Sequence, residues 1–259
     1  MKKKNTGLLT TKVLAHYSDI PFDFGEIRRL FFKESILYDF IRKNGIGEER
    51  IIDVGCSTGA NGIFIKGMFP HADYLGIDNN ENALDEARKN GINVLPGDNQ
   101  ELPLGNGIAG LTISEGVIHH TPMPFKSFSE LVRITASGGR IILYVYSRRS
   151  AYYYLYSFFF PLRLFYGSGG TPRIIIKKLF YDTAPLLIPL YKAMFIRGKC
   201  IRIYKRDFLN MISDQLLTPY IFFFTGKDIE KLCLMHGLEI EMFRRTRNGQ
   251  GLMYILKKH

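Results

Sequence analysis

The chain has 259 residues, of which 46% are hydrophobic and 23% are charged. These values are ordinary for a globular protein, and they exclude a mainly disordered or fibrous one. Lys and Arg number 35 against 24 Asp and Glu, which gives a net charge of +11. This excess favours an anionic partner, and a phosphorylated small molecule, a phospholipid surface and a nucleic acid all satisfy it.

Cysteine usage and hydropathy indicate the compartment. Cys56, Cys200 and Cys233 are too few and too widely spaced for a disulfide framework or a zinc site. The basic first four residues are followed by no proper apolar run, so we expect no signal peptide. Residues 150–162 form the longest uncharged apolar stretch, and its 13 residues are too few to cross a bilayer as a helix. We therefore expect a cytoplasmic protein without a metal site.

Apolar periodicity and turn residues predict helices and strands that alternate up to residue 146. In chain order we expect a helix at 26–44, a strand at 50–54, a helix at 59–68, a strand at 74–77, a helix at 80–90, strands at 93–95 and 109–114, a helix at 125–136 and a strand at 139–146. Such alternation predicts an α/β fold, with a parallel sheet covered by helices on both faces.

The alternation stops at 148–220, a segment that is aromatic, basic and punctuated by proline. It resumes with a helix at 225–237, in which Thr225 is the expected N-cap and Gly237 the stop. Two strands follow, at 238–244 and 251–257, joined by the hairpin signal Asn248-Gly249. The chain is therefore divided into an N-terminal helical cap (1–46), a core (47–147), a helical insertion after the fifth strand (148–220) and a C-terminal helix with the last two strands (221–259).

A glycine-rich turn, D-V-G-C-S-T-G at 53–59, joins the first expected strand to the first helix of the core. Glycines there let a ligand approach the backbone, and the helix start offers unpaired N–H groups. The dinucleotide fingerprint needs glycines at the first, third and sixth positions, and counting from Gly55 the third is Ser57 and the sixth Ala60. A phosphate-binding P-loop is excluded as well, because no Gly-Lys-Ser/Thr follows.

Acidic residues recur at the ends of the next strands. Asp78 ends the second, Asp98 follows the third, and Glu115 ends the fourth. In a parallel sheet these ends share one edge, where ligands bind at the topological switch point. There, a carboxylate after the second strand can accept hydrogen bonds from a ribose diol, and one after the third can accept from an adenine amino group.

Five motifs occur in a fixed order. They are D-V-G-C-S-T-G (53–59), L-G-I-D-N-N (75–80), G-D-N-Q-E-L-P-L (97–104), S-E-G-V-I-H-H-T (114–121) and S-G-G-R-I-I-L-Y-V-Y (137–146). With them, about 49–146 and again 225–256 resemble the class I S-adenosylmethionine-dependent methyltransferases, in particular the small-molecule group that includes the ubiquinone and menaquinone C-methyltransferases. Ser57 stands where many members have glycine. The resemblance implies a Rossmann-like, seven-stranded, mostly parallel sheet whose last strand is antiparallel.

The same resemblance implies S-adenosyl-L-methionine as cofactor and assigns roles to the matching residues. The methionine part would be held by the first motif, through Asp53, Gly55, Cys56, Ser57 and Gly59. The ribose hydroxyls would be bound by Asp78, with Asn79 beside it. The adenine would be bound by the carboxylate of Asp98 and the backbone N–H of Asn99, while Ser114 and Glu115 would line the site near the transferred methyl group.

His119 and His120 follow the fourth strand at the same edge. An imidazole titrates near neutrality, so either histidine is a candidate general base for an acceptor that must lose a proton. The structural alternative is that one of them caps or packs the turn before the next helix. Positioning and exclusion of water would supply the remaining catalysis.

The insertion carries much of the net charge. Residues 151–215 hold ten Lys and Arg against three Asp and Glu, and nine aromatic residues lie between Tyr152 and Tyr166. The plain interpretation is a helical lid with its own core and a solvated basic face. The sharper one is a lid over a small-molecule or lipid-like acceptor that also meets an anionic membrane surface. No nucleic-acid motif is recognisable, so nucleic acid is an unlikely partner.

Three functions remain open from the sequence. We expect a methyltransferase that acts on a small-molecule or lipid-like acceptor. A catalytically silent methyltransferase fold that serves as a binding or regulatory subunit is the alternative, and the competent residues at every cofactor position argue against it. A nucleic-acid methyltransferase is less expected, because no Asn-Pro-Pro-Tyr/Phe motif follows the fourth strand.

Overall fold

The structure is a computed structural model of the chain, and it describes residues 11–13, 16–17, 35–47, 49–193, 202–246 and 249–259. The strands are β1 (Ile51–Val54), β2 (Tyr74–Asp78), β3 (Val94–Pro96), β4 (Ala109–Glu115), β5 (Thr135–Tyr146), β6 (Leu238–Arg245) and β7 (Gly251–Lys258). The helices are α3 (Ile36–Asn44), α4 (Ala60–Met68), α5 (Glu81–Lys89), the short η1 (Ile118–His120), α6 (Pro124–Ile134), α7 (Ala151–Phe158), α8 (Phe160–Gly167), α9 (Gly170–Tyr191), α10 (Lys205–Gln215) and α11 (Gly226–His236).

The seven strands form one sheet in the order β3-β2-β1-β4-β5-β7-β6. Strands β1 to β5 are parallel, and β7 runs antiparallel to both β5 and β6. The chain order reverses between β1 and β4, so the crevice expected of a ligand site lies beyond the carboxyl ends of these two strands. The Rossmann-like fold and the antiparallel last strand are thereby confirmed.

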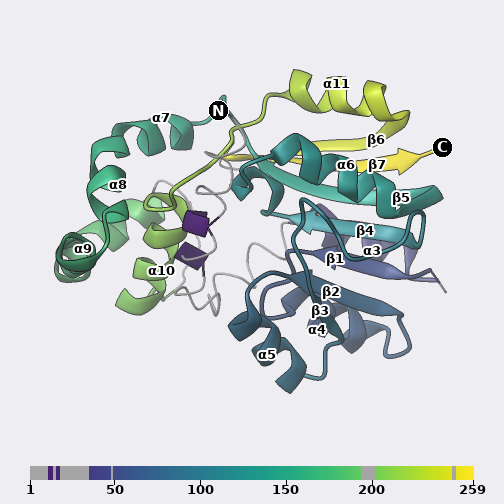
Figure 1. Cartoon of the computed structure of the whole chain (residues 1–259), viewed down its shortest axis with the longest axis horizontal. Coiled ribbons are helices and arrows are strands. Elements are labelled where there is room, and N and C mark those ends of the chain that lie inside the picture. The colour runs from purple at the N-terminus through teal and green to yellow at the C-terminus, as the bar shows by residue number, and fades with distance from the viewer. Residues whose placement is uncertain (1–10, 14–15, 18–34, 48, 194–201, 247–248) are drawn as a thin grey trace.

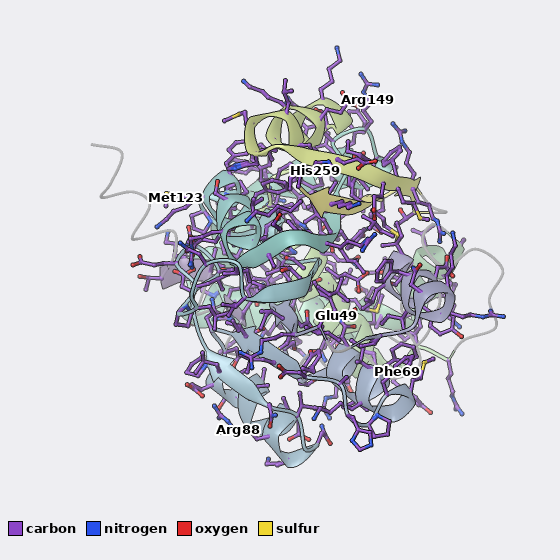
Figure 2. All side chains as sticks on the ribbon, turned by 90° about the vertical axis from the view of Figure 1, so that its right-hand side faces the viewer. Glu49, Phe69, Arg88, Met123, Arg149 and His259 are labelled. Carbon is purple, nitrogen blue, oxygen red and sulfur yellow. The ribbon has the colours of Figure 1, made fainter. Side chains whose placement is uncertain are left out.

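Helices cover both faces of the sheet because strand side chains alternate between the two faces. On one face Phe128 of α6 and Ile229 of α11 pack with Ile141 of β5 in one apolar cluster. On the other face Ile36 of α3 and Ile65 of α4 belong to a second cluster with other strand residues. Figure 2 shows side chains filling these layers, with the exposed Arg88 and Arg149 at the outside.

Helices α7 to α10 form a separate group at the side where β5 ends (Figure 1). They have their own apolar cluster, which includes Tyr152, Phe180 and Phe208 and is joined to the sheet through Tyr146. The insertion after the fifth strand is therefore helical. Helix α9 has 22 residues, but Pro185 and Pro189 lie within it, and among the described helices none is long and apolar enough to cross a membrane.

Two regions differ from the sequence prediction by more than one residue. The first expected helix, 26–44, starts only at Ile36, because Ser35 is extended (ψ 141°) and its side chain caps Leu37 N–H; residues 26–34 lie outside the described part. The helix expected at 125–136 ends at Ile134, and β5 begins at Thr135 rather than at 139. The helix ends there because the backbone of Thr135 is extended. The Thr135 hydroxyl donates to Leu131 O and lies 2.7 Å from the Thr112 hydroxyl.

Candidate active site

The glycine turn after β1 is shaped by left-handed backbone at three positions. Gly55, Ser57 and Gly59 have φ of 83°, 50° and 78°, a region that glycine enters without strain and serine rarely does. At Gly55 a Cβ would lie 2.3 Å from Cγ2 of Val117, so only glycine fits between the turn and the segment after β4. The backbone N–H groups of Gly55 and Cys56 both donate to Ile77 O of β2. The turn is therefore held against the neighbouring strand end.

Asp78 at the end of β2 joins two backbone segments. Its Oδ2 accepts the N–H of Ser57 at 2.8 Å, and its Oδ1 accepts the N–H of Asn80 at 3.0 Å. Carboxylate oxygens accept hydrogen bonds, and a ribose diol donates them. Asn80, rather than Asn79, caps helix α5 through its side chain, and Asn79 is exposed.

The loop after β3 is organised by Asp98, whose Oδ1 accepts the N–H of Gln100 at 2.8 Å. The Gln100 amide also donates to both carboxylate oxygens at 3.2 Å. The loop begins at Gly97, whose N–H bonds Asp78 O. Asp98 and the partly buried Asn99 therefore begin the loop after β3, which is bonded to the end of β2 through Gly97 and Asp78.

Asp53 is buried within the sheet, one residue before the end of β1. It is 1% exposed and accepts the Tyr74 hydroxyl of β2 at 2.7 Å. Burial of a carboxylate is costly unless hydrogen bonds satisfy it, and Tyr74 supplies one such bond from the neighbouring strand. The structure thus gives Asp53 a bond that holds β1 to β2, next to the glycine turn.

Ser114 and Glu115 end β4 beside the turn. Ser114 is fully buried, and Glu115 accepts the Ser35 hydroxyl at 2.5 Å. Ser35 also caps α3, so the N-terminal helix is fixed to the end of β4. No sequence motif indicated that the Ser35 hydroxyl would be a partner of Glu115.

The residues at this edge fit an adenosyl cofactor. The hydroxyl oxygens of Ser57 and Ser114 are shielded from solvent and have no hydrogen-bond partner among the described residues. Buried polar atoms are rarely left in that condition. Together with the backbone cradle at Gly55 and the two acceptor oxygens of Asp78, they match a ligand that carries hydroxyl and amino groups.

His119 and His120 lie on η1 and are buried, at 0% and 7% exposure. Burial, followed by the charge of His120, lowers the pKa of His119 well below its usual value. Burial also lowers the pKa of His120 to about 3, against a hydrogen bond that the imidazole donates to the Tyr220 backbone, which raises it. Both imidazoles are therefore neutral at pH 7. The His119 ring lies 4.0 Å from the Tyr146 ring, centroid to centroid, and 4.3 Å from that of His120.

A second group of polar residues comes from segments far apart in the chain. The Tyr17 hydroxyl donates to Asp214 Oδ1 of α10 at 3.3 Å, and it lies 3.2 Å from the Thr218 hydroxyl. The Tyr17 backbone carbonyl accepts the Asn80 amide at 2.9 Å, and its ring meets His120 edge-on. Tyr17 thus connects the cofactor edge, the histidines and the insertion.

Sequence reasoning missed Tyr17, Asp214, Tyr144 and Tyr146 as site residues. Tyr17 lies before the first of the five sequence motifs, and Tyr144 and Tyr146 lie in the hydrophobic C-terminal part of β5. The one available signal was that Asp214 is among only three acids in the basic stretch 151–215. A carboxylate in such a stretch is expected at the surface beside the basic side chains, and Asp214 is instead partly buried.

Comparison with known proteins agrees with the geometry. A family model described as "Methyltransferase domain" matches residues 52–143. Two curated relatives match a portion of similar length. The mouse protein named probable tRNA methyltransferase 9B is 31% identical over 38% of this chain and 22% of its own length. A rice chloroplastic 2-methyl-6-phytyl-1,4-hydroquinone methyltransferase is 29% identical over 35% of this chain and 28% of its own length. The chain thus spans well under a third of either relative.

Among solved structures, a S-adenosylmethionine-dependent methyltransferase from Thermotoga maritima, described as a possible histamine N-methyltransferase, aligns with a TM-score of 0.52. The alignment covers 90% of this chain and 95% of that one at 16% identity, so the likeness is one of fold. Residues 52–143 therefore match the methyltransferase domain family, in a chain with the fold of the S-adenosylmethionine-dependent methyltransferases, and the cofactor that this domain implies is S-adenosyl-L-methionine.

Proposed function

We propose that the chain is a S-adenosylmethionine-dependent methyltransferase whose acceptor is a small-molecule or lipid-like compound. The observation that carries the proposal is the arrangement around Asp78. This carboxylate links the glycine turn to the start of α5. The buried hydroxyls of Ser57 in the turn and of Ser114 near the end of β4 have no hydrogen-bond partner among the described residues. A merely structural turn needs no hydroxyls buried without partners.

The chain's own residues divide the work of binding. When bound, the cofactor supplies an electrophilic methyl group on a sulfonium. We propose that Asp78 accepts the ribose hydroxyls, Asp98 accepts the adenine amino group and Asn99 donates its backbone N–H. The turn of Gly55, Cys56, Ser57 and Gly59 holds the methionine part, with Asp53 beneath it, and Asn79 stays a proposed neighbour at the ribose. Ser114 and Glu115 line the space next to the methyl group.

The acceptor is proposed to lie between the carboxyl edge of the sheet and the insertion. Its walls are aromatic: Tyr144 and Tyr146 from β5, His119 and His120 from η1, and Tyr17. Flat aromatic walls suit a ring-containing acceptor, because ring contacts contribute about 0.5–1.5 kcal/mol each beyond the burial of area. The rice relative's name, a hydroquinone methyltransferase, supports this acceptor class.

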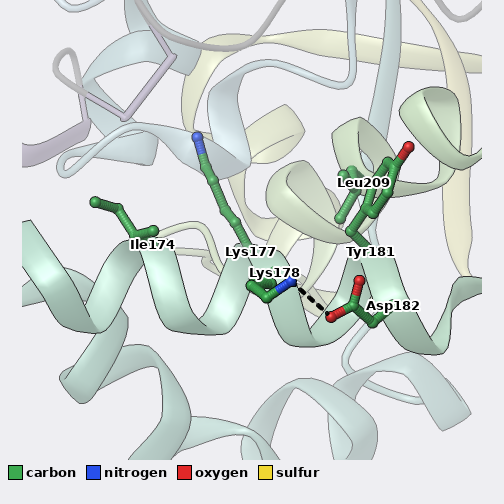
Figure 3. Close-up of a pocket in the computed structure, with 6 residues that line it drawn as sticks. All are labelled: Ile174, Lys177, Lys178, Tyr181, Asp182 and Leu209. Carbon is green, nitrogen blue, oxygen red and sulfur yellow. Dashed lines mark ion pairs between the residues drawn. The ribbon is translucent and has the colours of Figure 1, made fainter.

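The outer face of the insertion supports peripheral contact with an anionic membrane. Large apolar side chains are exposed along it, including Phe158 at 78%, Ile174 at 67% and Leu186 at 78%. Figure 3 shows a shallow pocket on α9 where Lys177 and Lys178 stand beside Ile174 and Leu209. Basic groups next to exposed apolar groups suit the boundary between lipid head groups and hydrocarbon.

A second candidate acceptor is tRNA, and the mouse relative's name and the charge of +11 favour it. A polyanionic acceptor would be held by exposed Lys and Arg and lost steeply as salt rises. The aromatic walls described above are buried or partly buried, which favours a small acceptor. The silent-subunit alternative predicts neither binding of the cofactor nor turnover.

The proposal is tested by calorimetry with S-adenosylmethionine and S-adenosylhomocysteine, followed by assays with tritium-labelled cofactor. The acceptor probes are bulk tRNA, a hydroquinone and a lipid extract. We expect binding of both cofactor forms and label in the hydroquinone or lipid fraction. Label in tRNA alone would establish the second candidate, and absence of cofactor binding would overturn the assignment as an enzyme.

A further inference from the structure

We propose that Asp214 of α10 is the general base of the reaction, and that the acceptor therefore carries an ionisable hydroxyl group. This inference rests on the function proposed above. It concerns a residue of the insertion, outside every motif of the cofactor edge.

The position of Asp214 is the first argument. The residue is partly buried near the end of α10 and accepts the Tyr17 hydroxyl. Its charge and that of Glu115 both act on Tyr144, which pairs with Glu115 across β4 and β5. The Tyr17 ring also meets the His120 ring edge-on, and the Tyr17 backbone carbonyl accepts the Asn80 amide. That places Asp214 on the acceptor side of the proposed site.

The chemistry of its surroundings is the second argument. Burial raises the pKa of Asp214 to about 7, and the Tyr17 hydrogen bond opposes that rise. A general base is most effective when its pKa lies near the working pH. The neutral histidines match this requirement less well, because the pKa of His120 is about 3. The titratable groups that face Asp214 or its immediate neighbours on the adjoining elements are His16, Tyr17, Tyr144, Tyr146, Tyr152 and Tyr191.

The tyrosines among these neighbours do not compete for the proton. Burial raises the pKa of Tyr144, Tyr146 and Tyr152, so these tyrosines stay neutral while Asp214 titrates. The Tyr152 hydroxyl donates to Gln215 O and the Tyr191 hydroxyl to Gln215 Oε1. In the proposed step the acceptor O–H bond breaks, its electron pair stays on the acceptor oxygen, and a new O–H bond forms at the Asp214 carboxylate. The oxygen that remains is the nucleophile for the methyl group.

The test uses the full chain with phenol, 4-cyanophenol and 4-nitrophenol as acceptor probes. We expect the wild type to methylate at least one of them, with kcat rising through a midpoint near pH 7 as Asp214 ionises. Asp214→Asn keeps an oxygen for the Tyr17 hydroxyl but cannot take the proton, so kcat should fall about 10²–10⁴-fold with unchanged cofactor affinity. Asp207→Asn, the same change in the first turn of α10, should behave as wild type.

The variant Tyr17→Phe shows whether Asp214 acts as a general base or only links the insertion to Tyr17. This change removes the hydrogen bond that lowers the pKa of Asp214, so the activity midpoint should move to higher pH. Infrared titration gives a readout independent of turnover: a protonated-carboxyl band should disappear near pH 7 in the wild type and be absent in Asp214→Asn. The proposal is overturned if Asp214→Asn keeps the wild-type pH profile, if His119→Asn or His120→Asn alone abolishes that profile, or if no phenol is methylated. Retained binding of S-adenosylmethionine would then leave the proposed function standing.

Discussion

Asp78 and Ser57 are joined by a 2.8 Å hydrogen bond from the Ser57 backbone N–H to the Asp78 carboxylate, so the glycine turn after β1 is fixed to the end of β2. Ser57 has a φ of 50°, which a serine adopts only when its surroundings stabilise it. The carboxylate provides that stabilisation and at the same time stands where a ribose is expected. One side chain thus shapes the turn and is also the group that we propose to bind the ribose.

Replacement of Asp78 tests this dual role. Asp78→Ala should weaken binding of S-adenosylmethionine by about 1.5–3 kcal/mol, because charged hydrogen-bond acceptors contribute about that much. Calorimetry on the folded variant measures the effect. Asp85→Ala on the exposed side of α5 is the matched control and should bind as wild type. Equal affinities for wild type and Asp78→Ala would remove Asp78 from the cofactor site.

Gly55 should tolerate no side chain. Gly55→Ala has to hold an alanine at φ 83° and to push Val117 aside, at costs of about 1–2 and about 1–3 kcal/mol. Gly91→Ala pays only the first cost, since φ is 73° there and nothing lies within 4 Å of its Cβ. Urea unfolding should therefore rank wild type, Gly91→Ala and Gly55→Ala in order of falling stability. Val117→Ala added to Gly55→Ala should restore part of the difference, and no restoration would show that contact with Val117 is not the cause.

The buried histidines should make stability depend on pH. The pKa of His120 is about 3 in the folded chain and about 6.5 when unfolded. Between these values the unfolded chain binds a proton that the folded chain does not, so stability falls as pH falls from about 6.5. The slope is about 1.4 kcal/mol per pH unit for each such histidine. Asp214 has the opposite effect on the pH dependence of stability, because its raised pKa lets the folded chain keep a proton up to about pH 7.

Unfolding titrations at several pH values between 4 and 7 measure this slope. His120→Asn should reduce it by about the contribution of one histidine. His71→Asn, at an exposed position, should leave it as in the wild type. An unchanged slope in His120→Asn would mean that this imidazole is already solvated in the folded chain.

The insertion should bind anionic vesicles through its basic face. Replacement of Lys177, Lys178, Arg202, Lys205 and Arg206 by Gln should abolish flotation with phosphatidylserine vesicles, because each basic residue near the surface contributes about 1 kcal/mol. High salt should weaken the wild-type interaction, since charges farther apart than about 10 Å are screened at 0.1 M. Neutral phosphatidylcholine vesicles should bind more weakly than anionic ones.

The matched control removes the same amount of charge elsewhere. Replacement of Arg42, Lys43, Arg88, Lys89 and Lys231, all exposed and all outside the insertion, should leave flotation nearly unchanged. Equal losses in both variants would assign the effect to net charge alone. If the wild type stays in the soluble fraction with both vesicle types, the exposed apolar face of the insertion is not a lipid-binding surface.

The sequence by itself determined the sheet domain and the sheet edge at which the proposed cofactor residues lie. Local signals were sufficient there, because a buried parallel strand, a glycine turn and an acid at the strand end lie within a few residues of one another. The ends of parallel strands then meet at one edge for geometric reasons that hold in any sheet of this kind. Asp78 and Asp98 could be placed at that edge before any coordinate was known, although their contacts could not.

Only the tertiary structure decided the acceptor side. Tyr17 and Asp214 are separated by 197 residues and bond to each other, and neither position carries a local pattern that indicates the other. The pKa of a carboxyl or an imidazole depends on how completely the folded chain removes it from water. The residues next to Asp214 and His120 in the sequence therefore do not predict the raised pKa of the first or the lowered pKa of the second. His119 and His120 looked like ordinary titrating histidines in the sequence, and burial against Tyr146 and Tyr17 made them neutral.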